Sequence, residues 1–339
     1  MAEPGPGGPE RVGTCLGPFR LEAVLGRGAT ATLYRALDTR SGSRVALKTA
    51  DGCSAAAAGR VEAEARAHVV HEHVVPLLER GEADGRRYLV LPLVEGPDLG
   101  ACLGGRPLAP RRALRLLDQV AGALDAVHAA GLVHLDVKPS NILVGTRDDG
   151  AEHAWLADFG LARAAGDRGA DAAATGVVAS PAFAAPEHLA GGVVDARTDL
   201  YSLTCVLFAA LTGHAPHRGT VAQVLAAHRD GSVPPTGLGP ALDAVVRRGL
   251  AIDPVRRWGS ARELVDAARA ALGEADPGPA PADRAPDPPR RLRDPVPPAP
   301  VVGFARPDGP WPLPVVAAAA LVLAVLVVGL VALLVSVVG

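Results

Sequence analysis

The chain has 339 residues, of which 49% are hydrophobic, enough to build the core of one large or two ordinary domains. Its 34 basic residues are offset by 36 acidic ones, and the net charge of −2 gives no electrostatic case for binding nucleic acid. Four widely spaced cysteines, Cys15, Cys53, Cys102 and Cys205, exclude a disulfide framework and a paired zinc motif, and are typical of free thiols in a reducing compartment.

Two residue types are almost missing from this composition. Lysine occurs only at Lys48 and Lys138, and asparagine only at Asn141, whereas Arg, Ala, Gly and Pro are abundant. Such a bias is typical of a GC-rich genome, in which lysine and asparagine are replaced wherever another residue serves. The three exceptions are therefore candidates for a chemical role.

Residues 1–18 are rich in Gly and Pro and predict a disordered N-terminus that is neither a signal peptide nor a membrane span. Residues 19–272 have a globular pattern. Alternating segments predict strands at 19–26, 31–37, 44–50, 74–82 and 86–94, with a helix at 54–70 between the third and fourth. Helical patterns follow at 111–131, 198–213, 220–231, 241–250 and 260–273. Strands followed by helices predict an α+β fold in two lobes, at about 19–93 and 97–272.

The C-terminal part changes character. Residues 273–312 predict an extended, disordered tether, because 13 of the 39 residues from 274 to 312 are proline. Residues 313–338 are 26 residues without a charge, and at ~1.5 Å per residue a helix of this length spans a hydrocarbon core of roughly 30 Å. They predict one transmembrane helix, with a buried soluble helix as the alternative. Arginines before this segment place the globular part in the cytoplasm, at the cell membrane.

The first chemical motif is a pair of glycines in the segment 25–36, "LGRGATATLYRA". Gly26 and Gly28 lie between two predicted strands, where glycine lets the backbone approach a phosphate closely. Ala31 stands where a third glycine would complete the motif. Alone, a segment of this kind is an ordinary hairpin more often than a phosphate-binding turn.

A lysine and two glutamates follow this hairpin. Lys48 ends the segment "VALK", and its charge suits nucleotide phosphates when a carboxylate holds it in place. Glu62 and Glu64 lie on the next predicted helix. They are two residues apart, so only one of them can point inward.

The segment "HLDVKPSNIL", residues 134–143, carries the remaining groups. Asp136 could orient an attacking hydroxyl and accept its proton, and Lys138 could neutralise a transferred phosphoryl group. Asn141 could hold a magnesium ion together with Asp158 of "ADFG". These groups are chemically sufficient for phosphoryl transfer.

Six motifs occur in order: "LGRGATATLY", "VALK", "HLDVKPSN", "DFG", "SPAFAAPE" and "DARTDLYSL". By these motifs, residues 19–272 resemble a protein kinase domain of the bacterial eukaryotic-like serine/threonine branch. The resemblance implies a bilobal fold and transfer of the γ-phosphate of ATP to Ser or Thr hydroxyls of protein substrates. It also implies Mg²⁺, with Mn²⁺ as a substitute, and autophosphorylation in membrane-proximal signalling.

The resemblance also assigns nucleotide-binding residues. They are Leu25, Gly26, Gly28, Leu33, Ala46, Lys48, Glu62, Leu91, Pro92 and Val94. Leu91 would be the gatekeeper, and the carbonyl of Pro92 and the amide of Val94 would contact adenine. Glu62, nine residues before His71, is preferred over Glu64 as the partner of Lys48 by the spacing of the family.

Further roles follow from the same resemblance. Glu187 would form a structural ion pair with Arg257, and Asp199 would support the catalytic loop from the helix that begins near residue 198. Ser180 stands at the position that distinguishes serine/threonine from tyrosine kinases, and Thr175 is a candidate autophosphorylation site. The neighbouring histidines at 68, 71 and 73 match a helix end and turn better than a metal site, and His134 is expected in the core.

Leu135 replaces an arginine that commonly gathers an activating phosphate, so we expect transfer without obligatory phosphorylation of the activation segment. Only Gly339 follows the predicted span, so we expect the activating signal to come from the cytosol or from within the membrane. Formation of a homodimer is one way in which such a signal could act. Both lysines and the only asparagine occupy motif positions. We therefore predict an active enzyme, with a pseudokinase or ATP-binding scaffold acting through the tether as the alternative.

Overall fold

The computed structural model describes residues 12–28, 31–50, 55–67, 69–147, 150–168 and 181–273. These residues lie within one compact unit, Met1–Asp283. Among them, no helix combines the length and the apolar character needed to cross a membrane. The predicted span at 313–338 and the predicted tether beyond residue 273 lie outside the described residues.

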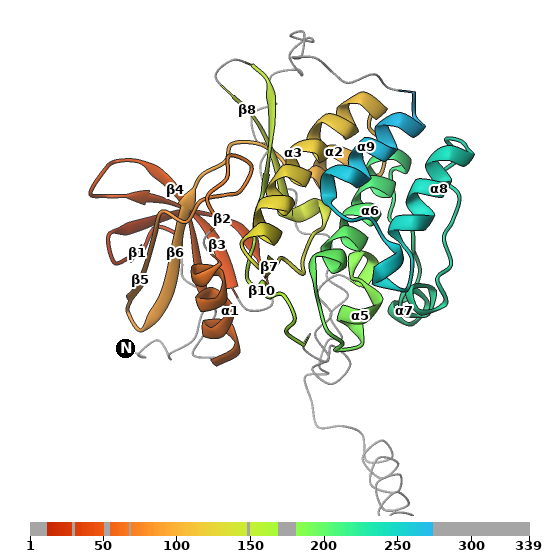
Figure 1. Ribbon diagram of the computed structural model, residues 1–339. Helices are drawn as coiled ribbons and strands as arrows, with labels where there is room; N and C mark the ends of the chain where they lie inside the picture. Colours follow the sequence, from red (N-terminus) through yellow and green to blue (C-terminus); the bar gives the residue numbers. More distant parts are fainter. Residues whose placement is uncertain are drawn as a thin grey trace, which may run out of the picture. The chain divides into compact units, whose positions relative to one another are not determined.

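The first lobe is an antiparallel sheet with the strand order β1-β2-β3-β4-β6-β5 (Figure 1). Its strands are β1 (Cys15–Leu16), β2 (Phe19–Arg27), β3 (Ala31–Asp38), β4 (Arg44–Ala50), β5 (Glu79–Ala83) and β6 (Arg86–Pro92). Helix α1 (Ala55–Arg66) packs against β4 and β6. The side chains on one face of the sheet form an apolar core that includes Phe19, Tyr34, Leu47 and Val90. The other face is left for α1 and for the predicted nucleotide-binding residues.

Two boundaries in this lobe differ from the prediction. The predicted disordered N-terminus, residues 1–18, is wrong at its end, because Cys15–Leu16 pair with β2 and Leu16 is fully buried in the apolar core. The helix predicted at 54–70 ends at Arg66, and the strand predicted at 74–82 begins only at Glu79. The chain between them is instead fixed to the second lobe.

That connection runs through His73. The backbone N–H of Leu156 donates to the His73 carbonyl at 2.8 Å, and the Val75 N–H donates to the Leu156 carbonyl at 2.9 Å. His71 and His73 lie in this turn, as the sequence predicts, while position 68 lies outside the described residues. Across the described ranges, no group of three His, Cys, Asp or Glu side chains could hold a metal ion.

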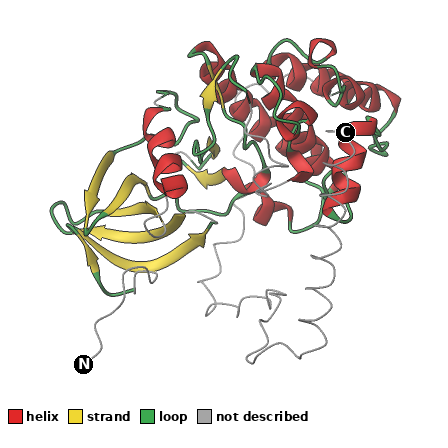
Figure 2. Ribbon diagram, turned by 90° about the horizontal axis from the view of Figure 1, so that it is seen from below, coloured by secondary structure: helices red, strands yellow, loops and turns green. Residues whose placement is uncertain are grey.

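The second lobe is mainly helical, which confirms the predicted α+β arrangement (Figure 2). Its helices are α2 (Leu99–Leu103), α3 (Pro110–Ala129), α5 (Pro186–Leu189), α6 (Ala196–Thr212), α7 (Val221–Asp230), α8 (Pro240–Gly249) and α9 (Ala261–Ala271). Its short strands are β7 (Leu132–Val133), β8 (Ile142–Thr146), β9 (Glu152–Leu156) and β10 (Arg163–Ala164). Single 3₁₀ turns are η1 (Pro139–Asn141), η2 (Pro181–Phe183) and η3 (Pro254–Arg256).

Helix α6 is buried on every side along most of its length, as expected of a helix that is apolar all round. A capping box fixes its start: the Asp195 carboxylate accepts backbone hydrogen bonds, and the Thr198 hydroxyl lies 3.2 Å from the Asp195 N–H. Gly213 ends it in the left-handed conformation, with φ +85°. The helix is therefore a rigid base for the groups that it carries.

The segment that joins the lobes packs tightly on β8. The Val144 N–H donates to the Pro97 carbonyl at 2.9 Å. At Gly96, a Cβ atom would overlap the carbonyl oxygen of Val144, so a glycine is required there.

Candidate active site

The register of the sheet gathers the predicted nucleotide residues on one face. Lys48 of β4 lies opposite Leu33 of β3, and Gly26 of β2 lies opposite Leu33. Ala46, two residues before Lys48, lies opposite Leu91 of β6. Directly opposed residues of an antiparallel pair share a face, so these five positions line the same side of the sheet.

A tight turn joins β2 and β3 at the edge of this face. The Gly28 N–H donates to the Ala31 carbonyl at 2.8 Å, and a Cβ at Gly28 would lie only 3.3 Å from that oxygen. Leu25 is exposed at a register shift between Val24 and Gly26. The turn brings the backbone of β2 and β3 close together beside Lys48.

Pro92 and Val94 lie where the sheet leads into the second lobe. Pro92 ends β6 opposite Val45. In the described part of the chain, the Val94 N–H has no hydrogen-bond acceptor. This donor is therefore available to a ligand.

Lys48 forms two ion pairs, one with the buried Glu64 and one with the partly exposed Asp158. Its Nζ lies 2.5 Å from Glu64 Oε2 and 2.7 Å from Asp158 Oδ1. The prediction that Glu62 is the partner of Lys48 is wrong. The Glu62 side chain is 33% exposed and faces Arg66, Arg80 and Arg87 at 3.4, 3.9 and 3.6 Å.

The face of α1 explains this choice. Val61 is buried against Ala50 and Leu89, with Ala65 beside it. Glu64 is three residues after Val61 and shares its inward face, whereas Glu62 is turned by about 100°. Val61 is the only large apolar residue of α1, so this signal was present in the sequence and could have identified Glu64.

Burial and the neighbouring charges shift the pKa values of Lys48, Glu64 and Asp158. Burial would lower the pKa of Lys48, but the carboxylates of Glu64 and Asp158 outweigh it and raise the pKa. Burial raises the pKa of Glu64, against the opposing effect of Lys48. Burial also acts to raise the pKa of Asp158, but Lys48 prevails and the pKa lies below its usual value.

The catalytic loop brings its three predicted side chains together. Lys138 Nζ and Asn141 Nδ2 donate to Asp136 Oδ2 at 2.7 and 2.9 Å, and Asn141 Nδ2 also donates to the Asp136 carbonyl at 2.8 Å. Within the described residues, Asp136 Oδ1 has no hydrogen-bond donor. That oxygen is free to accept a proton from a ligand hydroxyl.

Asn141 and Asp158 are suitable ligands for a hard divalent cation. Because the Asn141 amide nitrogen is engaged by Asp136, its Oδ1 is left to coordinate. The Asp158 side chain is 44% exposed, and Lys48 contacts only its Oδ1. Amide and carboxylate oxygens are the donors that Mg²⁺ prefers, and Mn²⁺ accepts them as well.

Asp199, at the start of α6, holds the backbone of the catalytic loop, as predicted. It is fully buried and accepts from the His134 N–H at 2.7 Å, from the Leu135 N–H at 2.8 Å and from the His128 ring at 2.8 Å. Burial acts to raise the pKa of Asp199, but these contacts with His128 and His134 outweigh it and lower the pKa. His134 is fully buried, as predicted.

Leu135 and Asp158 are two of the few non-glycine residues with positive φ, each at +66°. The strain costs roughly 1–3 kcal/mol per residue and persists only where other contacts fix the backbone. Leu135 is 5% exposed and packs in an apolar cluster with Val133, Val194 and Leu161. The leucine thus fills a buried space rather than facing solvent.

The segment after Asp158 is fixed on both sides of this apolar cluster. Strand β10 pairs with β7, and the Ala165 N–H donates to the Gly131 carbonyl at 2.9 Å. Gly166 N–H donates to the Val194 carbonyl at 2.9 Å, and Val194 N–H donates to the Asp167 carbonyl at 3.0 Å. Positions 175 and 180 lie outside the described residues.

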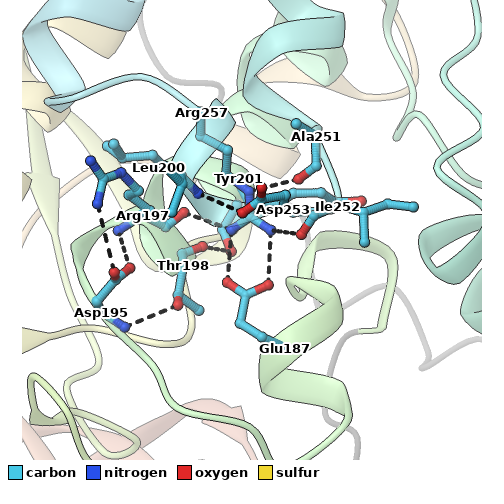
Figure 3. A network of polar contacts seen from close by, with 12 residues as sticks. Glu187, Asp195, Arg197, Thr198, Leu200, Tyr201, Ala251, Ile252, Asp253 and Arg257 are labelled. Carbon is cyan, nitrogen blue, oxygen red and sulfur yellow. Dashed lines mark hydrogen bonds and ion pairs between the residues drawn. The ribbon is translucent and has the colours of Figure 1, made fainter.

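The predicted Glu187–Arg257 pair is present in a dense polar network (Figure 3). The guanidinium of Arg257 donates to both Glu187 oxygens at 2.7 and 2.8 Å, and also to backbone carbonyls of Arg197, Ala251 and Ile252. The Arg257 side chain is fully buried. All of its donor nitrogens are therefore satisfied, and α5 is fixed to the base of α6.

Comparisons with known proteins agree with this geometry. The family model described as "Protein kinase domain" matches residues 19–266. "Serine/threonine-protein kinase PknE" of Mycobacterium tuberculosis is 39% identical over 315 residues, which cover 90% of this chain and 54% of PknE. "Serine/threonine-protein kinase PknH" of the same organism is 41% identical over 306 residues, which cover 86% of this chain and 47% of PknH. The chain thus spans about half the length of these relatives.

A solved structure shares the fold. The PknI kinase domain of Mycobacterium tuberculosis superposes with a TM-score of 0.57 and 27% sequence identity, and covers 78% of this chain and 100% of its own.

Proposed function

The chain belongs to the protein kinase domain family, and from this membership we propose that it is an ATP-dependent serine/threonine protein kinase. The observation that carries the proposal is the assembly of two charged clusters from distant parts of the chain. Lys48 is held between Glu64 and Asp158, and Asp136 is held between Lys138 and Asn141. Each cluster leaves free the donor or acceptor that phosphoryl transfer needs.

The proposed reaction uses these free groups. An ammonium has three donors, and Lys48 uses two of them on carboxylates, so the third is available to the nucleotide phosphates. Asp136 Oδ1 accepts the proton of the attacking Ser or Thr hydroxyl, while its Oδ2 is held by Lys138 and Asn141. Lys138 stands beside this base, where its charge offsets that of the phosphoryl group in transit.

We propose that Asn141 and Asp158 hold Mg²⁺, with Mn²⁺ as a substitute. When bound, the cation supplies charge neutralisation at the ATP phosphates. Asp136 keeps Asn141 oriented for this role through the two hydrogen bonds to its amide nitrogen. Leu33, Ala46 and Leu91 provide the apolar face beneath the nucleotide.

The proposal is tested by incubating the full chain with labelled ATP and magnesium beside Lys48→Ala and Asp158→Ala. We expect label on the chain itself or on a generic basic protein with the unmodified chain only. Nucleotide binding without any transfer of label would reject the enzyme and favour an ATP-binding scaffold.

We further propose that residues 313–338 anchor the protein in the cell membrane with a single span and the kinase domain in the cytoplasm. The 26 uncharged residues support this proposal. An arginine at the centre of a span costs about 2.5–3.5 kcal/mol of insertion, so the double variant Leu323→Arg with Leu326→Arg should leave the membrane fraction. Retention of the double variant in salt-washed membranes would contradict the anchor.

A membrane-bound chain can meet a second copy in the plane of the membrane, and we propose a homodimer as the activating assembly. Activity per molecule in vesicles should then rise with the number of chains per vesicle. Activity that is independent of this density would contradict the dimer.

We also propose that the kinase is active without phosphorylation of its activation segment. The apolar cluster around Leu135 and the backbone hydrogen bonds of Gly166 and Val194 support this idea, since apolar packing and main-chain hydrogen bonds fix the start of the segment. The Thr175→Ala variant should keep its activity within about twofold. A fall of the Thr175→Ala variant to background would reject the proposal.

A further inference from the structure

A pair of histidines joins the turn 71–75 to strand β9. His73 Nδ1 lies 3.0 Å from His153 Nε2, and the centroids of the two tilted rings are 4.3 Å apart. His153 is 4% exposed and the side chain of His73 is 14% exposed, so both rings are largely shielded from water. The reaction proposed above uses neither of these residues.

The two segments that this pair joins lead to the two partners of Lys48. The turn follows α1, which carries Glu64, and β9 ends at Leu156, two residues before Asp158. Backbone hydrogen bonds at Leu156 join the same two segments. Any displacement of the turn relative to β9 therefore changes the separation of the two carboxylates that hold Lys48.

The neighbours of the pair determine which nitrogens carry hydrogen. Arg147 Nη1 lies 3.5 Å from His153 Nδ1, and a guanidinium can only donate, so the neutral His153 ring carries its hydrogen on Nε2. The Glu72 carboxylate lies 4.0 Å from His73 Nε2 and favours a hydrogen on that nitrogen. His73 Nδ1 is then an acceptor for His153 Nε2–H. The Glu72 carbonyl, 3.0 Å from His153 Nε2, is a second acceptor for the same hydrogen.

A further proton has no favourable place at this contact. On His73 Nδ1 it would leave two N–H groups facing each other at 3.0 Å, and on His153 Nδ1 it would face the guanidinium of Arg147. The Ala154 carbonyl, 3.1 Å from His73 Nδ1, offsets part of this cost. Burial and the neighbouring His153 outweigh that carbonyl and Glu72, so the pKa of His73 lies below its usual value.

The other titratable and charged groups around the pair come from the turn, from the end of β8, from β9 and from α3. In that order they are His71 and Glu72, Arg147, Glu152, and the two arginines that pair with Glu152, Arg112 and Arg115. Glu72 and Arg147 lie 3.6 Å apart, so each offsets the charge of the other. Carboxylates paired with arginine keep their charge between about pH 5.5 and 7.5, so protonation of an imidazole is the change that acts on the contact in this range.

Resting on the proposed kinase activity, we propose that His73 and His153 are positioning residues for the ATP site, and that the hydrogen bond between them makes ATP binding sensitive to pH. In the neutral pair this bond holds the turn on β9, and with it Glu64 and Asp158 at the separation that brackets Lys48. Protonation of the pair removes the bond. The bonded form binds the added proton less readily than the released form, so it is complete above about pH 6.5, the usual pKa of imidazole, and is lost progressively as the pH falls below that value.

The test uses the full chain with magnesium, at about pH 7.5 and about pH 5.5. ATP affinity is measured by calorimetry, and transfer to a peptide by steady-state kinetics. His73→Asn places an amide oxygen near the position of Nδ1, so it keeps an acceptor for His153 that does not titrate, whereas His73→Leu removes the acceptor. His71→Asn is the matched control, because it removes an imidazole from the same turn and leaves the pair intact.

Acidification should weaken ATP binding by the unmodified chain about tenfold more than by His73→Asn, a difference that corresponds to one good hydrogen bond. His73→Leu should bind ATP about tenfold more weakly already at the higher pH, with the same shallow pH dependence as His73→Asn. His71→Asn should follow the unmodified chain at both pH values. At a given pH the KM for peptide should differ by no more than about twofold among the four proteins, because the contact lies on the nucleotide side of the site.

A double-mutant cycle tests whether His73 acts through Glu64. Because both changes release the same contact with Lys48, His73→Leu should weaken ATP binding by less than about threefold in a Glu64→Gln chain, against about tenfold alone. Additive losses would overturn the inference, and so would the same acid response in His73→Asn as in the unmodified chain, or its loss in His71→Asn.

Equal effects of His73→Leu on ATP and on peptide would show a merely structural role and would overturn the inference as well. The affinity measurements do not depend on phosphate transfer. An unmodified chain that binds ATP with the expected pH response but transfers no phosphate would therefore reject the kinase activity while supporting the positioning role of the two histidines.

Discussion

The two glutamates of α1 offer a sharp test of the site, because they differ by two positions and have opposite environments. Glu64 is buried with Lys48 at 2.5 Å, while Glu62 lies on the surface among arginines at 3.4 Å or more. The substitutions Glu64→Gln and Glu62→Gln remove the same charge and keep nearly the same shape. Only the first is expected to disturb the nucleotide site.

The magnitude follows from burial. Removing one partner of a buried ion pair costs about 3–5 kcal/mol, and the Gln amide together with the remaining Asp158 partner recovers part of it. A net loss of about 2.7 kcal/mol of transition-state stabilisation corresponds to about a 100-fold fall in kcat/KM. The Glu62 ion pairs are partly exposed and worth about 0–1 kcal/mol, so Glu62→Gln should stay within about threefold.

The assay is phosphate transfer from labelled ATP, with ATP affinity measured by calorimetry on the same preparations. Glu64→Gln should weaken ATP binding as well as transfer, since Lys48 is no longer held toward the phosphates. A loss in Glu62→Gln equal to that in Glu64→Gln would refute this reasoning. Full activity of Glu64→Gln would refute it as well.

Three further perturbations test the supporting structure. Asp199→Asn should lower kcat about 100-fold with little change in the KM for ATP, because an amide offers one acceptor oxygen to two backbone donors of the catalytic loop; steady-state kinetics checks this. Glu187→Ala should lower the free energy of unfolding by about 3–5 kcal/mol, since it leaves the fully buried Arg257 unpaired; urea unfolding with tryptophan fluorescence checks this. The pKa of His228 is lowered from 6.5 to about 4 in the folded chain, so on acidification the unfolded chain binds this proton at a higher pH than the folded chain does. The free energy of unfolding should therefore fall by about 3 kcal/mol from this residue as the pH drops from 6.5 to 4. His228→Gln should remove that part of the pH dependence, and an identical pH profile in both proteins would contradict it.

Local motifs are the part of the site that could be predicted from the sequence. Asp136, Lys138 and Asn141 lie within six residues, so the loop that carries them also brings them together. Counting nine residues back from the turn at His71 did not identify Glu64. Helix α1 ends at Arg66, and the chain after it is hydrogen-bonded to the second lobe, so this count does not follow the turns of the helix. The inward face of the helix, marked by Val61, was the better guide.

Other features have no local signal. The strand at Cys15–Leu16 is too short to have a pattern, and its stability comes from burying Leu16 in the sheet core. At Leu135 the sequence shows only that a positive charge is missing. It does not show that the leucine packs against Val194, which is far along the chain. The contact between Tyr201 and His228 likewise joins two helices and follows only from the fold.

Helix α6 has a consequence for how this sequence can change over time. Asp199 and Tyr201, two residues apart, face different sides of the helix. Asp199 holds the catalytic loop, and Tyr201 packs in the apolar cluster that contains Ala185 of the segment 181–189. Because the helix is buried almost throughout, a small change of volume in it displaces both partners at once. A deep mutational scan should therefore rank α6 beside the catalytic loop in intolerance to substitution, although its residues do not contact the nucleotide. Packing around α6 therefore limits substitution in this domain as strongly as the catalytic residues do.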